Sequence, residues 1–277
     1  MELSDAELSD AGLSDALAAD AISDVTPDSS DAGAADAKAL RVVNCPSFDR
    51  DVVLTCEYLC QFGRPFEGFV PVDTRLAGAR GFFAACARTE AASVDAFLIL
   101  ADELRSLDAP TSLVRACEDA ACEERSHART MSELAGIETV SIEASPRAKR
   151  NALAIAMENV RSGLVVETFA ALLNHFQSLN AGRVDLRAQL AAVASDESRH
   201  AELSRRIHAF LFTRLSDTER RAVETERLAA MADLEAEIRR TTPSPVDAEV
   251  GLPTRGQQAV LFEQLKRQVW MCDALVA

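Results

Sequence analysis

Aromatic residues and backbone breakers are scarce in this chain of 277 residues. Aromatics make up 5% of the sequence, with a single Trp and a single Tyr, and there are only 11 Gly and 9 Pro. Sheet proteins rely on aromatic and β-branched residues in their strands and on Gly and Pro in their many turns. Ala, Leu, Glu and Arg are abundant instead, and these residues favour helices. The composition therefore predicts an all-α fold.

Basic charge and long hydrophobic runs are also in short supply. The chain has 29 Lys and Arg against 44 Asp and Glu, a net charge of −15, and no cluster of basic residues. Nucleic acids and anionic membrane surfaces are bound by such clusters, so we expect neither as a partner. No stretch of about 18 apolar residues is present to form a membrane span. The first five residues include two acidic ones, Glu2 and Asp5, where a secretory signal is basic, so we expect a cytoplasmic protein.

The cysteines lack the pairing that a disulfide framework or a zinc knuckle requires. Their number is odd, and no Cys-x-x-Cys pair occurs. In the cytoplasm they would be reduced thiols, and most are expected to be small buried residues. Cys56 and Cys60 can share one helical face, so with Cys45 they leave a soft-metal site as an alternative. The seven are Cys45, Cys56, Cys60, Cys86, Cys117, Cys122 and Cys272.

The sequence divides into four parts by composition. Residues 1–40 repeat a Leu-Ser-Asp-Ala phrase and carry ten acidic residues against one lysine, so they predict a disordered acidic tail. Residues 41–75 predict an irregular N-terminal strap, because Gly and Pro interrupt their pattern. Residues 76–215 place apolar side chains at helical spacing and predict a four-helix bundle. Residues 216–277 predict a C-terminal helical extension.

Breaks and caps set the expected helix boundaries. Pro110 cannot sit inside a helix, so a helix ends before it and the next begins with Thr111 or Ser112 as its cap. Ser145 is expected to cap the third helix, and Ser216 opens a capping box for the fifth. The expected helices cover residues 76–107, 111–135, 145–179, 184–215 and 216–240, followed by a linker at 241–253 and a last helix ending near residue 270.

Two Glu-x-x-His motifs carry the chemistry. Glu124 and His127 form one, and Glu197 and His200 form the other. In a helix this spacing places a carboxylate and an imidazole on the same face, about one turn apart. A single motif of this kind in a Glu-rich helical sequence is more often a surface pair. The interpretation as a metal site therefore depends on what lies level with the two motifs.

Counting along the expected hairpins places one further Glu level with each motif. Two residues of an antiparallel hairpin are level when they are equally far from its turn. Glu90 and Glu124 are 34 residues apart, and their midpoint falls at Leu107, in the first expected turn. Glu167 and Glu197 are 30 residues apart, with their midpoint in the second expected turn. Both hairpins thus bring a Glu and a Glu-x-x-His to one depth of the core.

This convergence predicts a dinuclear metal site. Buried carboxylates are costly unless cations balance them, so four carboxylates and two imidazoles in one core indicate a bound metal pair. Oxygen-rich ligation with one His per ion suits two iron ions, with a mixed manganese–iron pair as the alternative. Glu124 and Glu197 are the expected bridges. The four carboxylates are also the predicted catalytic residues. The predicted metal ligands are Glu90, Glu124, His127, Glu167, Glu197 and His200.

The pattern of residues 76–215 resembles the ferritin-like superfamily of diiron carboxylate proteins. The segment Asp196 to His200 is similar to the Asp-Glu-x-Arg-His form of its oxygenase branch, and Ala87 to Val94 resembles uncharacterised bacterial ferritin-like proteins. The resemblance implies an antiparallel four-helix bundle with one long crossover, two bound irons, and additional C-terminal helices. It also implies that Asp196, and Glu123 by analogy, hydrogen-bonds a ligand histidine, with a solvated carboxylate as the alternative for both.

Differences from particular branches of the superfamily narrow the expectation. Ala170 stands where a rubrerythrin would carry an extra Glu, and a typical ferritin site lacks the second Glu-x-x-His. The sole tyrosine, Tyr58, lies outside the expected helices, which argues against a radical-generating reductase subunit. His175 and His208 lie eight residues beyond a ligand, more than two turns away, and are not expected to bind metal. The oxygenase-like arrangement remains by elimination.

The expected function is activation of dioxygen at the iron pair to oxidise a small organic substrate. The expected partners are dioxygen or peroxide, that substrate and an electron donor, and the assembly could be a homodimer. A second hypothesis is a ferroxidase or peroxide-scavenging protein that handles iron without an organic substrate. A third is a metal-free helical interaction module. Phe97, Phe169 and Phe176 are expected to be core residues, and Gly163 either leaves space beside the metals or permits close helix packing.

Overall fold

The computed structural model describes residues 63–66, 68–70, 76–145 and 148–271. The predicted tail 1–40 lies outside these residues, as do most of the strap 41–75, Tyr58, Cys272 and the alternative site at Cys45, Cys56 and Cys60. All the regular structure in the described residues is helical, as the composition predicts. None of the helices searched there is long and apolar enough to cross a membrane.

Helices α2 and α3 form the first antiparallel pair. α2 spans Gly78–Ser106 and α3 spans Thr111–Ala135, so both predicted boundaries are confirmed to within two residues. The predicted cap at Thr111 or Ser112 is wrong: Pro110 is the N-cap residue of α3, and no side chain caps that end. The carbonyl of Pro110 accepts hydrogen bonds from two amides of the first turn instead. The turn also holds Asp108 at φ 54°.

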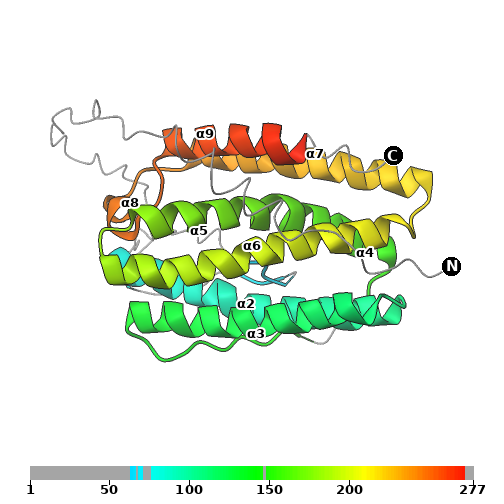
Figure 1. The fold of residues 1–277 in the computed structure, drawn as a ribbon, viewed down its shortest axis with the longest axis horizontal. Helices are drawn as coiled ribbons and strands as arrows, with labels where there is room; N and C mark the ends of the chain where they lie inside the picture. The colour runs from blue at the N-terminus through cyan, green and yellow to red at the C-terminus, as the bar shows by residue number, and fades with distance from the viewer. Residues whose placement is uncertain (1–62, 67, 71–75, 146–147, 272–277) are drawn as a thin grey trace, which may run out of the picture.

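A segmented helical rod and α6 form the second antiparallel pair. The rod consists of α4 (Ala152–Glu158), a π-helical segment η2 (Asn159–Glu167) and α5 (Thr168–Asn180). α6 spans Val184–Phe212 and packs against both η2 and α5. Figure 1 shows α2, α3, this rod and α6 lying along the length of the molecule.

The third helix begins later than the sequence predicts. Residues 148–151 are not helical, and the N-cap is Asn151, whose side chain accepts a hydrogen bond from the amide of Ala154 at 2.9 Å. The preceding Arg150 is held by Glu103 of α2, which accepts from both its backbone amide (3.1 Å) and its guanidinium (2.6 Å). A buried ion pair with another helix thus outweighs the local Ser-Pro start signal.

The C-terminal helices pack on the outer side of the second pair (Figure 1). α7 (Asp217–Arg240) starts with the predicted Ser216–Glu219 capping box, and α9 (Arg255–Leu265) continues into a π-helical turn η3 (Lys266–Trp270). The predicted linker contains a further short helix, α8 (Pro245–Val250), which the sequence analysis missed. Its own capping box, formed by Ser244 and Asp247, was the available signal.

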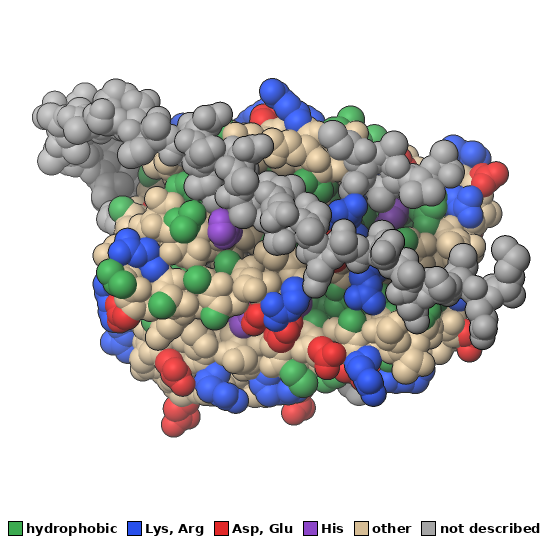
Figure 2. All heavy atoms as spheres, in the orientation of Figure 1, with side chains coloured by type: hydrophobic (Ala, Val, Ile, Leu, Met, Phe, Trp, Pro, Cys, Tyr) green, Lys and Arg blue, Asp and Glu red, His purple; other side chains and the backbone are tan. Residues whose placement is uncertain are grey.

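The core consists of two hydrophobic clusters, one after the other along the length of the helices. One joins the first part of α2 to α5, α7 and α9, and the other fills the end near the α2–α3 turn. Phe97, Phe169 and Phe176 are all buried core residues, as predicted. Acidic and basic side chains are interspersed over the face shown in Figure 2.

Candidate metal centre

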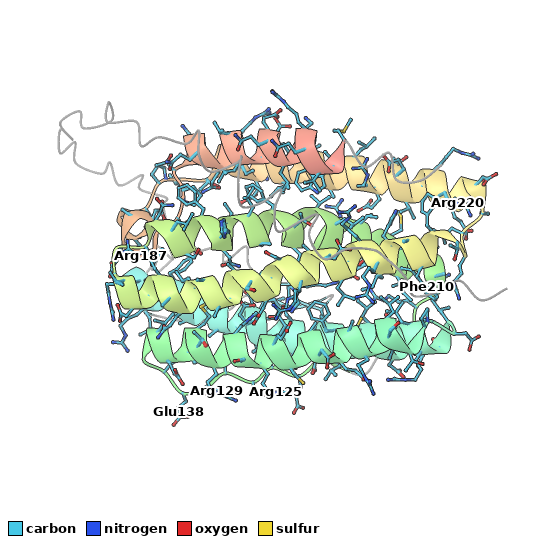
Figure 3. The ribbon with its side chains drawn as sticks, in the orientation of Figure 1. Arg125, Arg129, Glu138, Arg187, Phe210 and Arg220 are labelled. Carbon is cyan, nitrogen blue, oxygen red and sulfur yellow. The ribbon has the colours of Figure 1, made fainter. Side chains whose placement is uncertain are left out.

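The six predicted ligands converge between the two hydrophobic clusters. None of these residues is more than 2% exposed. Glu90 comes from α2, the first Glu-x-x-His from α3, Glu167 from the end of η2, and the second Glu-x-x-His from α6. In Figure 3, Arg125 and Arg129 point outward from α3, whereas Glu124 and His127 on the opposite face are buried. The six residues are Glu90, Glu124, His127, Glu167, Glu197 and His200.

These side chains form two overlapping groups, each able to hold a metal ion. We call Glu90, Glu124, His127 and Glu197 the first position. The second position consists of Glu124, Glu167, Glu197 and His200. Within each group one ligand atom per residue lies within 4.8 Å of the others. Glu124 and Glu197 belong to both groups, which is the arrangement that bridging carboxylates require.

Nine buried oxygen and nitrogen atoms of these ligands form no hydrogen bond within the described residues. Both oxygens of Glu90, Glu124 and Glu197 lack one, as do Glu167 Oε1 and the Nδ1 atoms of the two histidines. Buried polar atoms without partners are rare in folded proteins, and here they all face one another. Two divalent cations would balance the four carboxylate charges and would occupy these lone pairs. The residues present thus fit a metal pair.

Burial and mutual repulsion raise some carboxyl pKa values at this site, and the imidazoles lower others. Burial, aided by the charges of Glu124 and Glu197, raises the pKa of Glu90 well above its ordinary value. Burial also raises the pKa of Glu167, to about 7. For Glu197 burial acts upward, but the two imidazoles outweigh it and lower the pKa to about 2. Without metal the centre therefore retains protons that cations could replace.

Each histidine presents Nδ1 to the carboxylates and Nε2 to a partner on the opposite helix. His127 Nδ1 lies 3.3 Å from Glu197 Oε1, and its Nε2 lies 2.9 Å from Asp196 Oδ2. His200 Nδ1 lies 3.3 Å from Glu124 Oε1, and its Nε2 lies 2.8 Å from Glu123 Oε2. Both hydrogen bonds were expected from the resemblance, and both are present. They fix the ring orientations and leave Nδ1 as the atom able to bind metal.

Arg199 links the two outer carboxylates, a role that the sequence analysis did not assign. Its Nη2 lies 2.6 Å from Glu123 Oε1 and 2.5 Å from Asp196 Oδ1. The two carboxylates that hold the histidines, one on α3 and one on α6, are thus bound by the same exposed guanidinium. The favourable charge is consistent with the lowered pKa of Asp196, where burial acts upward but His127 and Arg199 prevail.

The π-helical segment positions Glu167 at its last residue. π-helical turns inside α-helices are frequent at functional sites, because they re-aim side chains. Gly163 lies within this segment, and a Cβ added there would stand 2.5 Å from Ser204 Oγ and 3.0 Å from Arg64 Nη1. Of the two explanations considered for Gly163, close packing is therefore the one that the geometry supports. The sequence analysis did not predict the π register.

Arg64, from the predicted strap, reaches the edge of the centre. Its guanidinium is buried and pairs with Glu158 through two contacts of 2.7 and 3.0 Å. Its Nη1 lies 3.4 Å from Ser204 Oγ and 4.0 Å from Glu167 Oε2. Its backbone amide donates to Ser93 Oγ of α2 at 2.7 Å. Neither Arg64 nor Ser204 was named from the sequence, because neither belongs to a motif.

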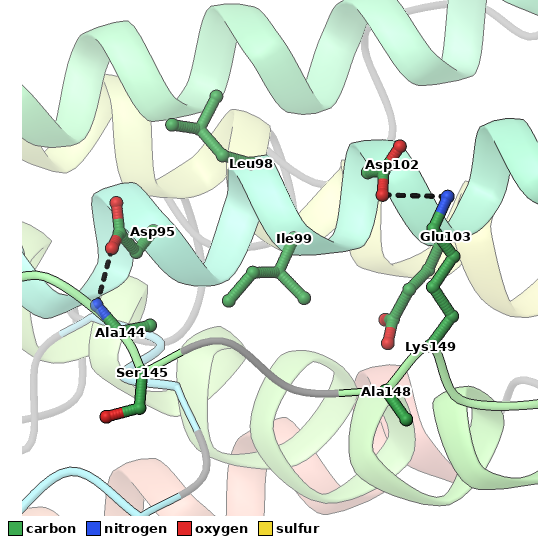
Figure 4. Close-up of a pocket in the computed structure, with 9 residues that line it drawn as sticks. All are labelled: Asp95, Leu98, Ile99, Asp102, Glu103, Ala144, Ser145, Ala148 and Lys149. Atoms are coloured by element: carbon green, nitrogen blue, oxygen red, sulfur yellow. Dashed lines mark hydrogen bonds and ion pairs between the residues drawn. The ribbon is translucent and has the colours of Figure 1, made fainter.

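A chain of ion pairs connects Arg64 with a surface groove. Glu158 also lies 3.7 Å from Arg150, which pairs with Glu103 at 2.6 Å. Glu103 lines a groove of about 330 Å³ between α2 and the connection that precedes α4 (Figure 4). The polar groups of the groove are paired, for example Asp102 with Lys149 at 2.8 Å. Its lining residues are Asp95, Leu98, Ile99, Asp102, Glu103, Ala144, Ser145, Ala148 and Lys149.

The remaining histidines and cysteines of the described residues stand apart from the two metal positions. His175 and His208 are in neither group, in line with their exclusion from the predicted ligands. Cys86 and Cys117 are buried, while Cys122 is exposed. Burial raises the pKa of Cys117 to about 12, so this thiol is protonated at neutral pH.

Comparison of the chain with protein-family models, with curated proteins and with solved structures gave no match.

Proposed function

We propose that this protein is a ferritin-like, dinuclear iron oxidoreductase that activates dioxygen to oxidise a small organic substrate. The observation that carries the proposal is the pair of four-residue groups sharing Glu124 and Glu197, with nine unpartnered ligand atoms facing one another. Oxygen-rich ligation with one imidazole per ion is the donor set that iron or manganese prefers.

The arrangement of helices supports the ferritin-like part of the proposal. α2 and α3 pair antiparallel, η2 and α5 pair antiparallel with α6, and the segment between α3 and α4 crosses from one pair to the other. We take this arrangement to be a four-helix bundle with one long crossover, in which each pair would contribute a Glu and a Glu-x-x-His. The additional helices α7, α8 and α9 would then form an extension to the bundle.

The protein's own residues would bind, orient and shield the metals. Glu90 and Glu167 would be terminal ligands, Glu124 and Glu197 bridges, and the histidines would contribute Nδ1. Bound iron would supply the redox chemistry that reduces dioxygen. Asp196 and Glu123 would hold the imidazoles in their ligating tautomer. The complete burial of the carboxylates would exclude bulk water, and electrons would come from an external donor.

Metal content tests this proposal first. Protein loaded anaerobically with Fe(II) should contain about two irons per chain by elemental analysis, and Glu124→Ala or Glu197→Ala should lose dinuclear binding. His208→Ala is the matched control, since His208 is buried on the same helix as Glu197 but lies outside both positions. Retention of two metals in either Glu variant would overturn the ligand assignment.

Oxygen reactivity then separates the enzyme from an iron-handling protein. The reduced, iron-loaded protein should consume dioxygen and regain its reduced state with an electron donor, without accumulating ferric mineral. Mineral formation in a large hollow assembly, visible by electron microscopy, would favour iron storage instead. Failure to bind any metal would leave the helical interaction module.

A further inference from the structure

The two terminal carboxylates have different surroundings, although the six ligands are otherwise arranged symmetrically. In the part of the chain that the structure describes, both oxygens of Glu90 lack hydrogen-bonding partners. Glu167 has only one such oxygen, because its Oε2 accepts a hydrogen bond from Ser204 Oγ at 2.9 Å. Glu90 can therefore offer two oxygens to a metal, whereas Glu167 offers one unless it gives up the serine.

A cation also lies beside the second position. Arg64 Nη1 is 4.0 Å from Glu167 Oε2, and its charge acts on Glu167, whereas the charges that act on Glu90 are those of Glu124, Glu197 and His127. A guanidinium at this range repels a divalent ion, and burial leaves little water to screen it. Glu158 offsets part of that charge through Nε and Nη2 of Arg64, whereas Nη1 is the atom near Glu167.

We propose that the two metal positions are unequal: the first binds tightly and fills first, and the second binds more weakly and keeps an open coordination site. This inference rests on the proposed dinuclear function. Ser204 and Arg64 are the positioning residues that create the difference. A small exogenous ligand would bind at the second position, where the Arg64 guanidinium and the Ser204 hydroxyl favour an anion.

Titration of the metal-free full-length protein with Co(II) under argon tests the order of filling. Calorimetry should resolve two binding steps whose dissociation constants differ by at least about tenfold. Glu167→Ala should remove the weaker step and leave the tighter one, while Glu90→Ala should remove the tighter one. Loss of the tighter step in Glu167→Ala would overturn the inference.

The role of Ser204 has a matched control. Ser204→Ala frees Glu167 Oε2, so the second dissociation constant should fall several-fold while the first stays unchanged. Ser132→Ala removes another fully buried hydroxyl, one that bonds only to backbone groups, and it should change neither constant. Unchanged constants in Ser204→Ala would overturn the assignment of Ser204.

The role of Arg64 needs a paired substitution, because removing it alone would bury Glu158 without its main partner. Arg64→Gln combined with Glu158→Gln should lower the dissociation constant of the second step. It should also weaken the binding of azide to the Co(II)-loaded protein, which the visible absorption spectrum of the cobalt measures. Circular dichroism and thermal unfolding establish that each variant is folded.

The outcomes distinguish the inference from the function on which it rests. The inference is supported if two binding steps are seen and the difference between their dissociation constants becomes smaller in the Ser204 and Arg64–Glu158 variants. Two equal steps in the unsubstituted protein would overturn the inference while leaving the dinuclear function intact. No cobalt binding, with no binding of Fe(II) or Mn(II) either, would overturn both.

Discussion

At the scale of single residues, the histidines depend on carboxylates that belong to the opposite helix. The Nε2–carboxylate contacts are 2.9 Å for His127 and 2.8 Å for His200. Each imidazole is thereby fixed by a residue that comes directly before the bridging Glu of the other motif. Substitution of one outer carboxylate should therefore affect one metal position more than the other.

Asp196→Asn tests this coupling. Asn cannot provide the charge that stabilises the His127 tautomer, so affinity at the first position should fall about 10-fold to 100-fold, the usual effect of losing such a partner. Glu123→Gln should produce the same loss at the second position. Metal titration with Co(II) measures both, and an equal loss at both positions in each variant would contradict the assignment.

The convergence of the four buried carboxylates could be predicted from sequence because helices have a fixed rise. Glu90 and Glu124 could be placed level from their distance to Pro110, and Glu167 and Glu197 from the break at Gly182, since each residue advances a helix by about 1.5 Å. Arg64 could not be found in this way. It reaches the centre from an irregular segment, and its contacts depend on tertiary packing that no local pattern specifies.

His208 shows how burial alone changes a histidine. It is 3% exposed, and neither ring nitrogen has a hydrogen-bonding partner among the described residues. Burial, together with the charge of Arg227, lowers its pKa from 6.5 to about 4. Between these two values the unfolded chain binds a proton that the folded chain does not, so acidification through this range favours unfolding.

His208→Leu should remove this pH dependence. The free energy of unfolding of the unsubstituted protein should decrease by about 2 to 3 kcal/mol more than that of the variant between pH 7 and pH 4. Urea unfolding at a series of pH values measures the difference. His175→Leu is the control, because His175 is only half-buried and should contribute less. Parallel pH profiles for His208→Leu and the unsubstituted protein would contradict the prediction.

At the scale of elements, the C-terminal helices support the π-helical segment that carries Glu167. Trp270 Nε1 donates to the carbonyl of Leu164 at 2.8 Å, three residues before that ligand. Arg161 of the same segment pairs with Glu226 of α7 at 2.5 Å and with Asp233 at 2.8 Å. A change of helical register leaves backbone groups without their usual partners, and Trp270 satisfies one of them.

Trp270→Phe should loosen this segment. The ring contact with Phe262 can persist, but the buried Leu164 carbonyl loses its donor, which costs about 1 to 3 kcal/mol. Amide hydrogen exchange measured by mass spectrometry should accelerate in residues 159–167 more than in α6. Val269→Ala removes buried apolar contact from the same turn without touching the hydrogen bond, and it should lack this local effect.

The limits of sequence prediction are also clearest at this scale. The boundaries of α2, α3 and α7 follow from Pro110 and from the capping box at Ser216, which are local signals. The start of α4 does not, because residues 148–151 are not helical and the ion pair of Arg150 with Glu103 ties this segment to α2. The π register of η2 depends on contacts with α6, α7 and Trp270, all distant in sequence.

At the scale of the whole molecule, the candidate metal centre lies between the two hydrophobic clusters and joins α2, α3, the α4–α5 rod and α6. Four buried carboxylates at this point oppose folding when no cation balances them. Metal binding should therefore stabilise the entire fold. For one site, a free metal concentration 100 times the dissociation constant adds about 2.7 kcal/mol to the free energy of unfolding.

Thermal unfolding measures this linkage, with Glu90→Gln as the informative variant. Co(II) should raise the melting temperature of the unsubstituted protein by about 5 to 10 °C, since 1 kcal/mol corresponds to about 2 to 4 °C in a protein of this size. Glu90→Gln removes a buried carboxyl whose pKa is raised by burial and by two neighbouring carboxylates. The metal-free variant should therefore melt at a higher temperature than the metal-free unsubstituted protein, and the metal-loaded variant at a lower one. A variant that melts lower in both forms would mean that Glu90 stabilises the fold independently of metal, which would contradict its role as a ligand.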